Sequence, residues 1–392
     1  MKVLITTIFD YPHEGGLSTH VTTLKKGLET SGHTVDVLSI SNISTWKKKL
    51  LAQGPGFLMN KLKKGKGQLT NDKQRMKLLA ELIKDHEHHY DIINSQDIFA
   101  TLASLETNLP VVATIHGYYA YEAISRGAIE TDSSEAKEIK DLERKAYTKA
   151  VANITVDQRI KDYVYETAQA EATVVRNFID PEPFLKPGKE IRSKFGFPEN
   201  APMLFVPRRL TEKNGVIYPL IALKQIAEKH PDVILVYAGT GEQLPAIKKK
   251  TSEFNLEDHV YMLGSVAHSE MVELYKTSQI ALIPSVHSHG VEEATSISAL
   301  EAMGSGTPVI AGAVGGLKEL IDHRTNGLLF ADRDEKELTH HILYLLDNPL
   351  QAQDMANKAQ QKIQQIHSHS AASEKFLDIY AKAIQKESTP SF

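Results

Sequence analysis

Short apolar runs alternate with amphipathic helical patterns along the whole chain. The apolar run over residues 2–9 predicts a buried strand, and hydrophobic residues at helical spacing between 21 and 28 predict a helix that ends near Gly32. A second apolar run over 34–40 predicts the next strand, so the chain opens with a strand–helix–strand unit. Strands that alternate with helices form parallel sheets covered on both faces, which predicts an α/β fold.

The same alternation continues through both halves of the chain. Further strands are predicted over 91–95, 110–116, 152–156 and 172–175, and then over 203–207, 233–239, 260–264, 280–285, 307–312 and 327–330. Each set of strands, with the helical patterns between its members, predicts one doubly wound domain.

The break between the two sets lies in the stretch NFIDPEPFLKPGKE, residues 177–190. Three prolines and a glycine interrupt the periodicity there. We therefore predict an N-terminal domain over 1–180 and a C-terminal domain over 181–368. The last residues, 369–392, predict an amphipathic helix that packs back toward the N-terminal domain.

Composition and charge narrow the function classes. The 392 residues are 41% hydrophobic and 24% charged, an ordinary globular mixture, and the formal net charge of -4 argues against a nucleic-acid partner. The absence of cysteine excludes disulfides, thiolate metal sites and a cysteine nucleophile. The first apolar run is too short for a signal peptide, and no stretch reaches the roughly 20 apolar residues that span a bilayer. We expect a cytoplasmic protein.

Two glutamates, Glu293 and Glu301, flank the predicted start of a helix that follows the strand at 280–285, with Thr295 or Ser296 as its cap. Ligands of doubly wound sheets bind outside the carboxyl ends of the strands, where a helix N-terminus offers free N–H groups to a phosphate. Because a carboxylate accepts hydrogen bonds from sugar hydroxyls, the pair predicts a nucleotide sugar. On the pair alone, the alternative stays open that Glu293 complements the helix dipole and Glu301 is a surface residue.

The loop after the strand at 203–207 adds two cations, Arg209 and Lys213, at the same sheet edge. An arginine fork and a lysine point charge that face a helix N-terminus predict a diphosphate clamp, and two solvated surface cations are the simpler alternative. Gly239 follows another strand, where the backbone can approach a ligand closely, and Val266 follows the next strand, where the backbone can meet a base.

Two stretches carry a family resemblance: PSVHSHGVEEATSISALEAMGSGTPVIA at 284–311 and RRLTEKNG at 208–215. Together with two glycines after the first strand, they resemble the GT4 group of retaining glycosyltransferases. The resemblance covers most of the chain and is strongest in the C-terminal domain. It implies the GT-B fold, two doubly wound Rossmann-like domains facing a central cleft, with the nucleotide sugar on the C-terminal domain and no metal requirement.

Carried over residue by residue, the resemblance implies a role for each charged residue of the C-terminal domain. Glu301 holds the ribose, and Glu293 lies at the transferred sugar. Arg209 and Lys213 grip the diphosphate and stabilise the departing nucleotide. Of these four, the resemblance implies that Glu293, Arg209 and Lys213 act in catalysis, together with His116 of the N-terminal domain.

Backbone groups complete the implied donor site. The amides of Thr295, Ser296 and Ile297 face phosphate or sugar, and the backbone of Val266 faces the base. The chain departs from the family at Ala294, Thr295 and Ser296, where the family often has glycine or serine followed by Phe-Gly. This departure leaves the identity of the donor sugar open.

In the N-terminal domain, Gly15 and Gly16 lie between the first strand and its helix. Their N–H groups predict an anion nest, with a plain tight turn as the alternative, and the resemblance places this loop at the donor phosphate and the acceptor. His116 ends a strand, and the resemblance places it near the donor sugar; a structural histidine is the alternative. The tyrosines just after it, at 118–121, offer rings for an acceptor to stack on.

The segment over 46–67 has seven lysines and no acidic residue, interleaved with tryptophan, leucine, phenylalanine and methionine. It predicts peripheral contact with an anionic membrane, on the inner face for a cytoplasmic protein, and a solvated loop is the alternative. The pair Asp332 and Asp334 resembles a D-x-D metal motif, but the helical pattern behind it favours Asp334 as a helix cap, so no metal site is predicted.

The sequence therefore predicts a retaining hexosyltransferase that moves a sugar from a nucleoside-diphosphate sugar, UDP-linked, to a cell-envelope, lipid or small-molecule acceptor without a cofactor. Two alternatives stay open. A nucleotide-sugar epimerase or hydrolase would consume donor with no acceptor present. A non-catalytic sugar-binding protein would not need a diphosphate clamp.

Overall fold

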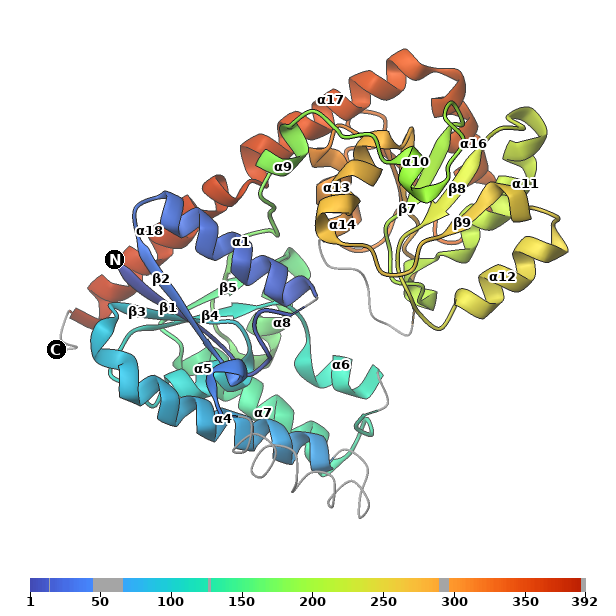
Figure 1. Cartoon of the computed structure of the whole chain (residues 1–392). Coiled ribbons are helices and arrows are strands. Elements are labelled where there is room, and N and C mark those ends of the chain that lie inside the picture. Colours follow the sequence, from blue (N-terminus) through green and yellow to red (C-terminus); the bar gives the residue numbers. More distant parts are fainter. Residues whose placement is uncertain (14, 45–65, 126–127, 289–295, 389–392) are drawn as a thin grey trace. The chain divides into compact units, whose positions relative to one another are not determined.

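The computed structural model describes residues 1–13, 15–44, 66–125, 128–288 and 296–388. The chain divides into two compact units: Met1–Asn177 together with the C-terminal helix from His369, and Phe178–Ser368. The sequence puts the boundary at 180 and assigns the C-terminal helix to the same side. Helices lie on both faces of each sheet (Figure 1), so the predicted α/β class is confirmed.

The first unit is built on six parallel strands in the order β2-β1-β3-β4-β5-β6. The strands are β1 (Lys2–Thr7), β2 (Thr34–Ser39), β3 (Ile92–Ser95), β4 (Val111–Ile115), β5 (Ala152–Thr155) and β6 (Thr173–Val174). The helices are α1 (Gly16–Thr30), α4 (Lys66–His86), α5 (Ile98–Ser104), α6 (Tyr119–Ser125), α7 (Ser134–Lys149), α8 (Gln158–Ala168) and α18 (His369–Ser388), with short 3-10 turns η1 (Ile40–Asn42) and η3 (Glu87–His89).

The second unit repeats the plan with the order β12-β11-β10-β7-β8-β9. Its strands are β7 (Met203–Val206), β8 (Ile234–Tyr237), β9 (Val260–Met262), β10 (Ile280–Ile283), β11 (Val309–Gly312) and β12 (Leu328–Phe330). Its helices are α9 (Glu182–Leu185), α10 (Arg192–Phe195), α11 (Ile217–Lys229), α12 (Leu244–Glu253), α13 (His268–Thr277), α14 (Ile297–Gly304), α15 (Leu317–Leu320), α16 (Glu335–Asp347) and α17 (Pro349–Ile366), with turns η4 (Glu212–Asn214) and η5 (Glu257–His259).

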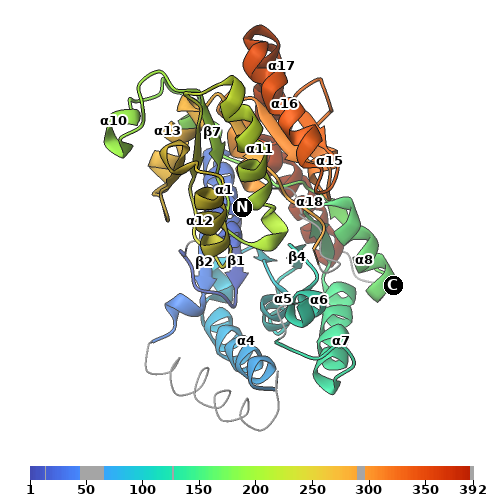
Figure 2. The ribbon, with the colours of Figure 1, turned by 90° about the vertical axis from the view of Figure 1, so that its right-hand side faces the viewer.

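Both faces of the second sheet are buried, which explains its continuous apolar strands. On β7, Met203 and Phe205 point into one hydrophobic cluster, and Leu204 and Val206 point into another. Helices α13, α14 and α17 pack on the first cluster, and α11 and α16 supply most of the helical residues of the second. Helix α11 lies between α12 and α16 on that second face (Figure 2). A strand covered on both sides has no polar face, so it reads as an apolar run.

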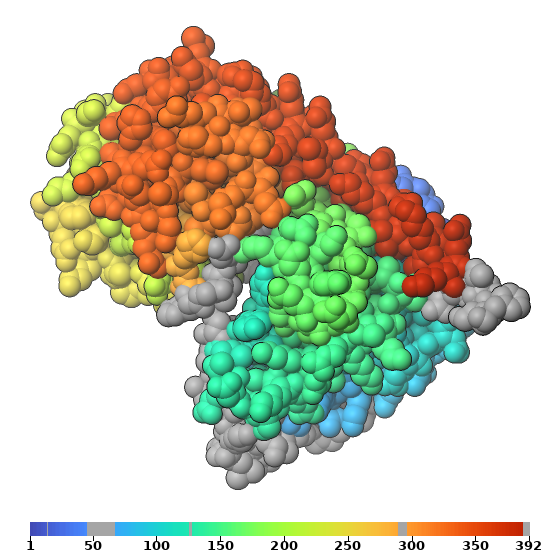
Figure 3. All heavy atoms as spheres, turned by 180° about the vertical axis from the view of Figure 1, so that it is seen from behind, coloured from blue at the N-terminus to red at the C-terminus, as the bar shows by residue number. Residues whose placement is uncertain are grey.

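The C-terminal helix α18 packs on α1 inside the first unit. Gly27 of α1 lies so close to α18 that a Cβ there would meet the Ser373 Oγ at 2.2 Å and the His369 carbonyl oxygen at 2.7 Å. Phe376 and Tyr380 of α18 are fully buried, and the outer face of the helix is visible in red in Figure 3. Helix α18 therefore contributes to the core of the first unit.

Helix ends follow the sequence signals. Helix α1 stops at Thr30, and Gly32 follows with a φ of 82°, as its position predicts. Asp334 accepts hydrogen bonds from the N–H groups of Lys336 and Glu337 at the start of α16, so its prediction as a helix cap is confirmed. The segment predicted to meet a membrane lies outside the described residues, apart from its last two positions. Among the described helices, none has the length and hydropathy to cross a membrane.

A buried carboxylate on α7 holds the start of α6. Glu143 accepts hydrogen bonds from the Tyr163 hydroxyl at 2.6 Å, the Tyr147 hydroxyl at 3.4 Å and the Ala120 N–H at 3.5 Å. Burial raises the pKa of Glu143 to about 7, against the lowering effect of these hydrogen bonds. The side chain therefore titrates near neutral pH inside the core of the first unit.

Glu143 makes the stability of the first unit depend on pH. Between the ordinary glutamate pKa of 4.5 and the raised value of about 7, the native state keeps a proton that the unfolded state has lost. The free energy of unfolding therefore falls as pH rises through this window, by about 3 kcal/mol. Urea unfolding at a series of pH values should show this slope, and Glu143→Gln should reduce it by the contribution of Glu143. Glu138→Gln, on the exposed side of the same helix, is the control, and an equal slope in both variants would contradict the assignment.

Candidate active site

The strand order puts the crevice of the second unit between β7 and β10. Chain direction around the sheet reverses there, because β8 and β9 follow on one side of β7 and β11 and β12 on the other side of β10. Ligands of open parallel sheets bind at such a switch point, outside the carboxyl ends of the strands. The loop over 207–216 after β7 and the loop that follows β10 border this crevice.

A buried arginine ties these two loops together. Arg208 is only 8% exposed. Its guanidinium donates hydrogen bonds to Asn214 Oδ1 at 2.6 Å, Ser285 Oγ at 3.1 Å and Ser296 Oγ at 2.7 Å. Asn214 in turn donates to the Arg209 carbonyl oxygen at 2.7 Å. A single fork thus fixes the loop after β7, the end of β10 and the start of α14 in one arrangement.

Sequence reasoning missed Arg208 and selected its neighbour. The two arginines are adjacent in the sequence, and only the folded chain shows which one is buried. Burial of Arg208 depends on its three polar partners, Asn214, Ser285 and Ser296. Ser285 and Ser296 are 77 and 88 residues away in the chain. Nothing local in the sequence pairs them with Arg208.

Backbone packing at this edge depends on glycine. Gly215 has a φ of 60°, and a Cβ there would meet the Pro284 carbonyl oxygen at 1.8 Å. Gly239 has a φ of 148°, and a Cβ there would meet the Arg208 carbonyl oxygen at 2.2 Å. Gly239 therefore lies against the neighbouring loop, and both positions require glycine for conformation and for space.

Arg209 and Lys213, the predicted clamp, both point away from the core. Both side chains are exposed, and neither has a hydrogen bond or ion pair with any residue that the structure describes. The Lys213 carbonyl oxygen accepts the Val286 N–H at 3.0 Å, which ties the turn carrying Lys213 to the loop after β10. The cations thus sit on a rigid backbone, with their charge available to a ligand.

The N-terminus of α14 lies at the same crevice. Ser296 is the N-cap residue, but its side chain makes no capping hydrogen bond and instead accepts one from Arg208. The expected side-chain cap at this position is therefore absent, because the hydroxyl is used to hold the arginine. Ile297 begins the helix and packs half-buried against the first hydrophobic cluster of this unit. Glu293 and Thr295 fall outside the described residues.

Glu301 lies in the second turn of α14 and is 8% exposed. Its Oε2 accepts a hydrogen bond from the Tyr275 hydroxyl at 2.9 Å, and its Oε1 lies 3.7 Å from Nδ1 of His268. Burial raises the pKa of Glu301, and His268 and Tyr275 oppose that rise. The surface-residue alternative is wrong for Glu301, because the carboxylate is buried and oriented by two partners.

Val266 lies in the loop between β9 and α13, half-buried against the same cluster. Two residues earlier, the Gly264 carbonyl oxygen accepts a hydrogen bond from the Gly239 N–H at 2.7 Å. The loops after β8 and β9 are therefore joined by backbone, and Val266 sits on the same edge as Glu301 and Gly239.

In the first unit, His116 follows β4 and belongs to a buried polar network. Its Nε2 lies 2.9 Å from Gln96 Oε1, and the Gln96 amide donates to Asn94 Oδ1 at 2.6 Å. The His20 ring packs edge-on against His116 with 4.5 Å between centroids. Burial lowers the pKa of His116 well below its usual value and that of His20 to about 4, so both rings are neutral near pH 7.

His20 is a further residue that sequence reasoning missed. Its Nδ1 lies 3.3 Å from Asn177 Oδ1 at the end of the first unit. A signal was present, because His20, Leu24 and Leu28 are four residues apart and share the buried face of α1. Gly15 and Gly16 lie exposed at the start of the same helix, and Gly15 has a φ of 152°.

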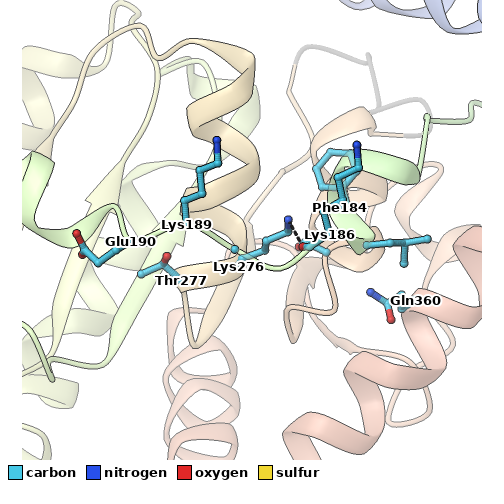
Figure 4. Close-up of a pocket in the computed structure, with 10 residues that line it drawn as sticks. Phe184, Lys186, Lys189, Glu190, Lys276, Thr277 and Gln360 are labelled. Atoms are coloured by element: carbon cyan, nitrogen blue, oxygen red, sulfur yellow. Dashed lines mark hydrogen bonds between the residues drawn. The ribbon is translucent and has the colours of Figure 1, made fainter.

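A separate hollow of about 530 Å³ lies at the opposite, amino-terminal edge of the second sheet (Figure 4). Lys186, Lys189 and Lys276 line it together with Glu190 and Gln360. The Lys276 ammonium donates to the carbonyl oxygens of Lys186 at 2.6 Å and Pro183 at 2.9 Å. Lys276 therefore fixes the segment around 183–186, with which the second unit begins. This contact lies at the edge of the sheet opposite the crevice.

Comparisons with known proteins cover both units. A family model described as glycosyl transferases group 1 matches residues 188–362, and one described as glycosyltransferase family 4 matches residues 14–183. An uncharacterized glycosyltransferase of Methanocaldococcus jannaschii is 27% identical, over 98% of this chain and 99% of that protein.

Solved structures share the fold. Sucrose-phosphate synthase from Thermosynechococcus elongatus superposes with a TM-score of 0.74 at 18% identity, over 98% of this chain and 99% of that one. Anabaena HepE in complex with UDP superposes with a TM-score of 0.71 at 19% identity, over 97% of this chain and 100% of that one. The predicted GT-B fold is confirmed by these similarities.

Arg208→Lys should destabilise the second unit, because the lysine ammonium lacks the planar guanidinium fork with which Arg208 reaches three acceptors on separate segments. We expect a loss of about 3 kcal/mol, or a fall in the Tm of that unit of roughly 6–12 °C. Arg209→Lys, at the exposed neighbour, is the matched control and should change stability by no more than about 0.5 kcal/mol. Calorimetry of both variants checks this, and equal Tm values would disprove the structural role of Arg208.

Proposed function

The chain belongs to the group 1 glycosyltransferases, and we propose that it transfers a sugar from a UDP-linked donor to an acceptor hydroxyl, with retention at the anomeric carbon. One observation carries this proposal. At the switch point of the second sheet, two exposed cations, Arg209 and Lys213, lie on the loop after β7, which Arg208 joins to the start of α14. Cations and a helix N-terminus together match the charge of a diphosphate.

The buried carboxylate of Glu301 is proposed to bind the nucleoside part of the donor. Glu301 is one turn into α14 from the N-terminus and is oriented by Tyr275 and His268. A carboxylate held in this way is suited to accept hydrogen bonds from the two ribose hydroxyls. Among the structural neighbours, Anabaena HepE has been solved with UDP and with UDP-glucose, which supports a uridine donor for this chain.

Catalysis in this proposal is electrostatic. The acceptor oxygen forms a bond to the anomeric carbon on the face that the leaving group occupies, as the bond from that carbon to the β-phosphate oxygen breaks. The acceptor proton passes to an oxygen of the departing UDP. Arg209 and Lys213 stabilise the negative charge that develops on the diphosphate, and a rigid, prearranged cation is most effective there. We propose that neutral His116 acts on the donor sugar and that Glu293 orients the sugar hydroxyls.

We propose further that no metal ion takes part, because the two cations supply the neutralisation that a divalent ion supplies at other diphosphate sites. The acceptor is a cell-envelope component, a lipid or a small molecule, and the basic segment over 46–67 is proposed to bring the protein to an anionic membrane.

Removing either cation should slow transfer strongly. Arg209→Ala and Lys213→Ala should each lower kcat with UDP-glucose by about 10²–10³-fold, because each loses a charge that acts on the leaving group. Lys248→Ala, an exposed lysine on α12, is the control and should match the wild type. Turnover is measured as UDP release across a panel of acceptors. Wild-type rates in both cation variants would disprove the clamp, and full UDP release without any acceptor would favour a hydrolase.

Chelation should leave activity unchanged. Dialysis against EDTA, followed by assay in EDTA, is expected to give the same rate as assay with added Mg²⁺ or Mn²⁺, because the charge on the diphosphate is met by side chains. UDP release with UDP-glucose is the measurement, and apyrase assayed in the same EDTA buffer verifies that metal has been removed. Loss of activity that Mn²⁺ restores would refute the metal-free mechanism.

A further inference from the structure

A cavity of about 200 Å³ opens at the carboxyl edge of the first sheet, next to His116. We name it the His116 cavity. Its apolar wall comes from Phe9 and Leu17 near β1 and α1, and from Ile98 and Ile115 at α5 and β4. It lies wholly within the first unit, at the end of the sheet where ligands of doubly wound folds bind.

The polar side chains that line the His116 cavity are already engaged. Asp97 accepts hydrogen bonds from the Ala100 N–H at 2.8 Å, the Ile8 N–H at 2.9 Å and the Thr7 hydroxyl at 2.8 Å. The Asp97 carboxylate thus caps α5 and holds the end of β1, and it has little remaining capacity to accept hydrogen bonds from a ligand.

Other polar atoms of the wall follow the same pattern. Thr114 Oγ1 accepts a hydrogen bond from the Asn94 amide at 2.9 Å, and the Tyr119 hydroxyl donates to Asp72 Oδ2 at 2.6 Å. A group with many hydroxyls would lose its hydration here and find few partners in exchange, which costs free energy. An apolar group gains by the same burial.

The charges of the side chains that line the cavity also favour an uncharged ligand group. Asp97 and Glu122 line the cavity, and the described residues of its lining include no lysine or arginine. A carboxylate or phosphate inside would therefore be repelled and left without a counter-ion. A group that enters the cavity is therefore expected to be uncharged. Any positive charge on the same molecule would have to lie outside the apolar part of the cavity.

His116 lines the cavity, and one of its ring nitrogens can accept a hydrogen bond. Because the Gln96 amide nitrogen donates to Asn94, its Oε1 faces His116 and receives the Nε2 hydrogen. In that tautomer Nδ1 has a lone pair, and it accepts no hydrogen bond from the residues the structure describes. Burial lowers the pKa of His116, so the ring is neutral and can accept a hydroxyl hydrogen near neutral pH.

The volume sets the size of the occupant. An apolar protein cavity of about 150 Å³ holds benzene, so about 200 Å³ accommodates one ring or a short alkyl chain. We propose, on the basis of the sugar-transfer function above, that the His116 cavity receives an uncharged apolar group of the acceptor and that the acceptor hydroxyl then lies at Nδ1 of His116. The acceptor is thus an alcohol with an apolar substituent next to the reacting hydroxyl, rather than a bare polyol.

Binding to the full-length protein tests the cavity without relying on turnover. Isoleucine methyl groups are labelled, and the protein is titrated with benzyl alcohol and, separately, with myo-inositol as a polar ring of similar size. The methyl signals of Ile98 and Ile115 should shift with benzyl alcohol and not with inositol, and that of Ile283, in the core of the second unit, should not move.

Two substitutions at Leu17, which is half-buried and lines the cavity, give a matched pair. Leu17→Trp fills the space and should weaken the benzyl alcohol response roughly tenfold or more, whereas Leu17→Met keeps the volume and should retain it. Equal shifts with inositol, no shift with either probe, or a full response in Leu17→Trp would overturn the proposal.

Transfer assays then separate this inference from the proposed function. With UDP-glucose as donor, benzyl alcohol should be glucosylated with a kcat/KM roughly tenfold or more above that of inositol. Transfer that prefers inositol, in a protein that binds UDP, would overturn the acceptor class and leave the donor proposal intact. If calorimetry detects no UDP binding while the Ile98 and Ile115 signals still shift with benzyl alcohol, the donor proposal fails and the apolar preference of the cavity stands.

Discussion

The arrangement of the second unit depends on one buried guanidinium. Parallel strands deliver several loops to one edge of the sheet, and nothing in the strands themselves fixes how those loops lie against one another. Arg208 does so by donating to Asn214, Ser285 and Ser296, which lie on three different segments. Because a buried charge without partners is costly, the loops are held wherever all three acceptors can be met. The position of α14, and of the residues beside it, follows from that requirement.

At this edge of the second sheet, the positive side chains are exposed and the negative side chain is buried. Arg209 and Lys213 stay exposed, where a highly charged ligand can displace water from them, and Glu301 is buried and oriented by Tyr275 and His268. A diphosphate carries its charge at the surface of such a crevice, and a ribose brings hydroxyl groups that suit a carboxylate in a less polar setting. The loop after β7 and helix α14 thus carry two chemically different groups, exposed cations and a buried carboxylate, at one edge of the sheet.

The first unit uses its sheet edge differently. Its histidines are neutral because burial opposes their protonation, and the surrounding polar groups form closed pairs such as Gln96 with Asn94. The outcome is a cavity whose polar side chains are mostly hydrogen-bonded to one another. One unit therefore offers charge and the other offers an apolar wall with a single acceptor nitrogen, a contrast that fits a charged donor and a less polar acceptor.

The sequence by itself determined the α/β class, the strand positions and the cap at Asp334, because these depend on local periodicity and on contacts a few residues apart. It also predicted a donor-binding role for Arg209, Lys213 and Glu301 from their places after strands. Only the tertiary structure decided that Arg208 is the buried member of the arginine pair, that Gly239 serves a neighbouring loop, and that Ser296 holds an arginine instead of capping its helix. Each of these outcomes depends on a partner distant in the chain, and hydrogen bonding between distant segments leaves no periodic trace in a single sequence.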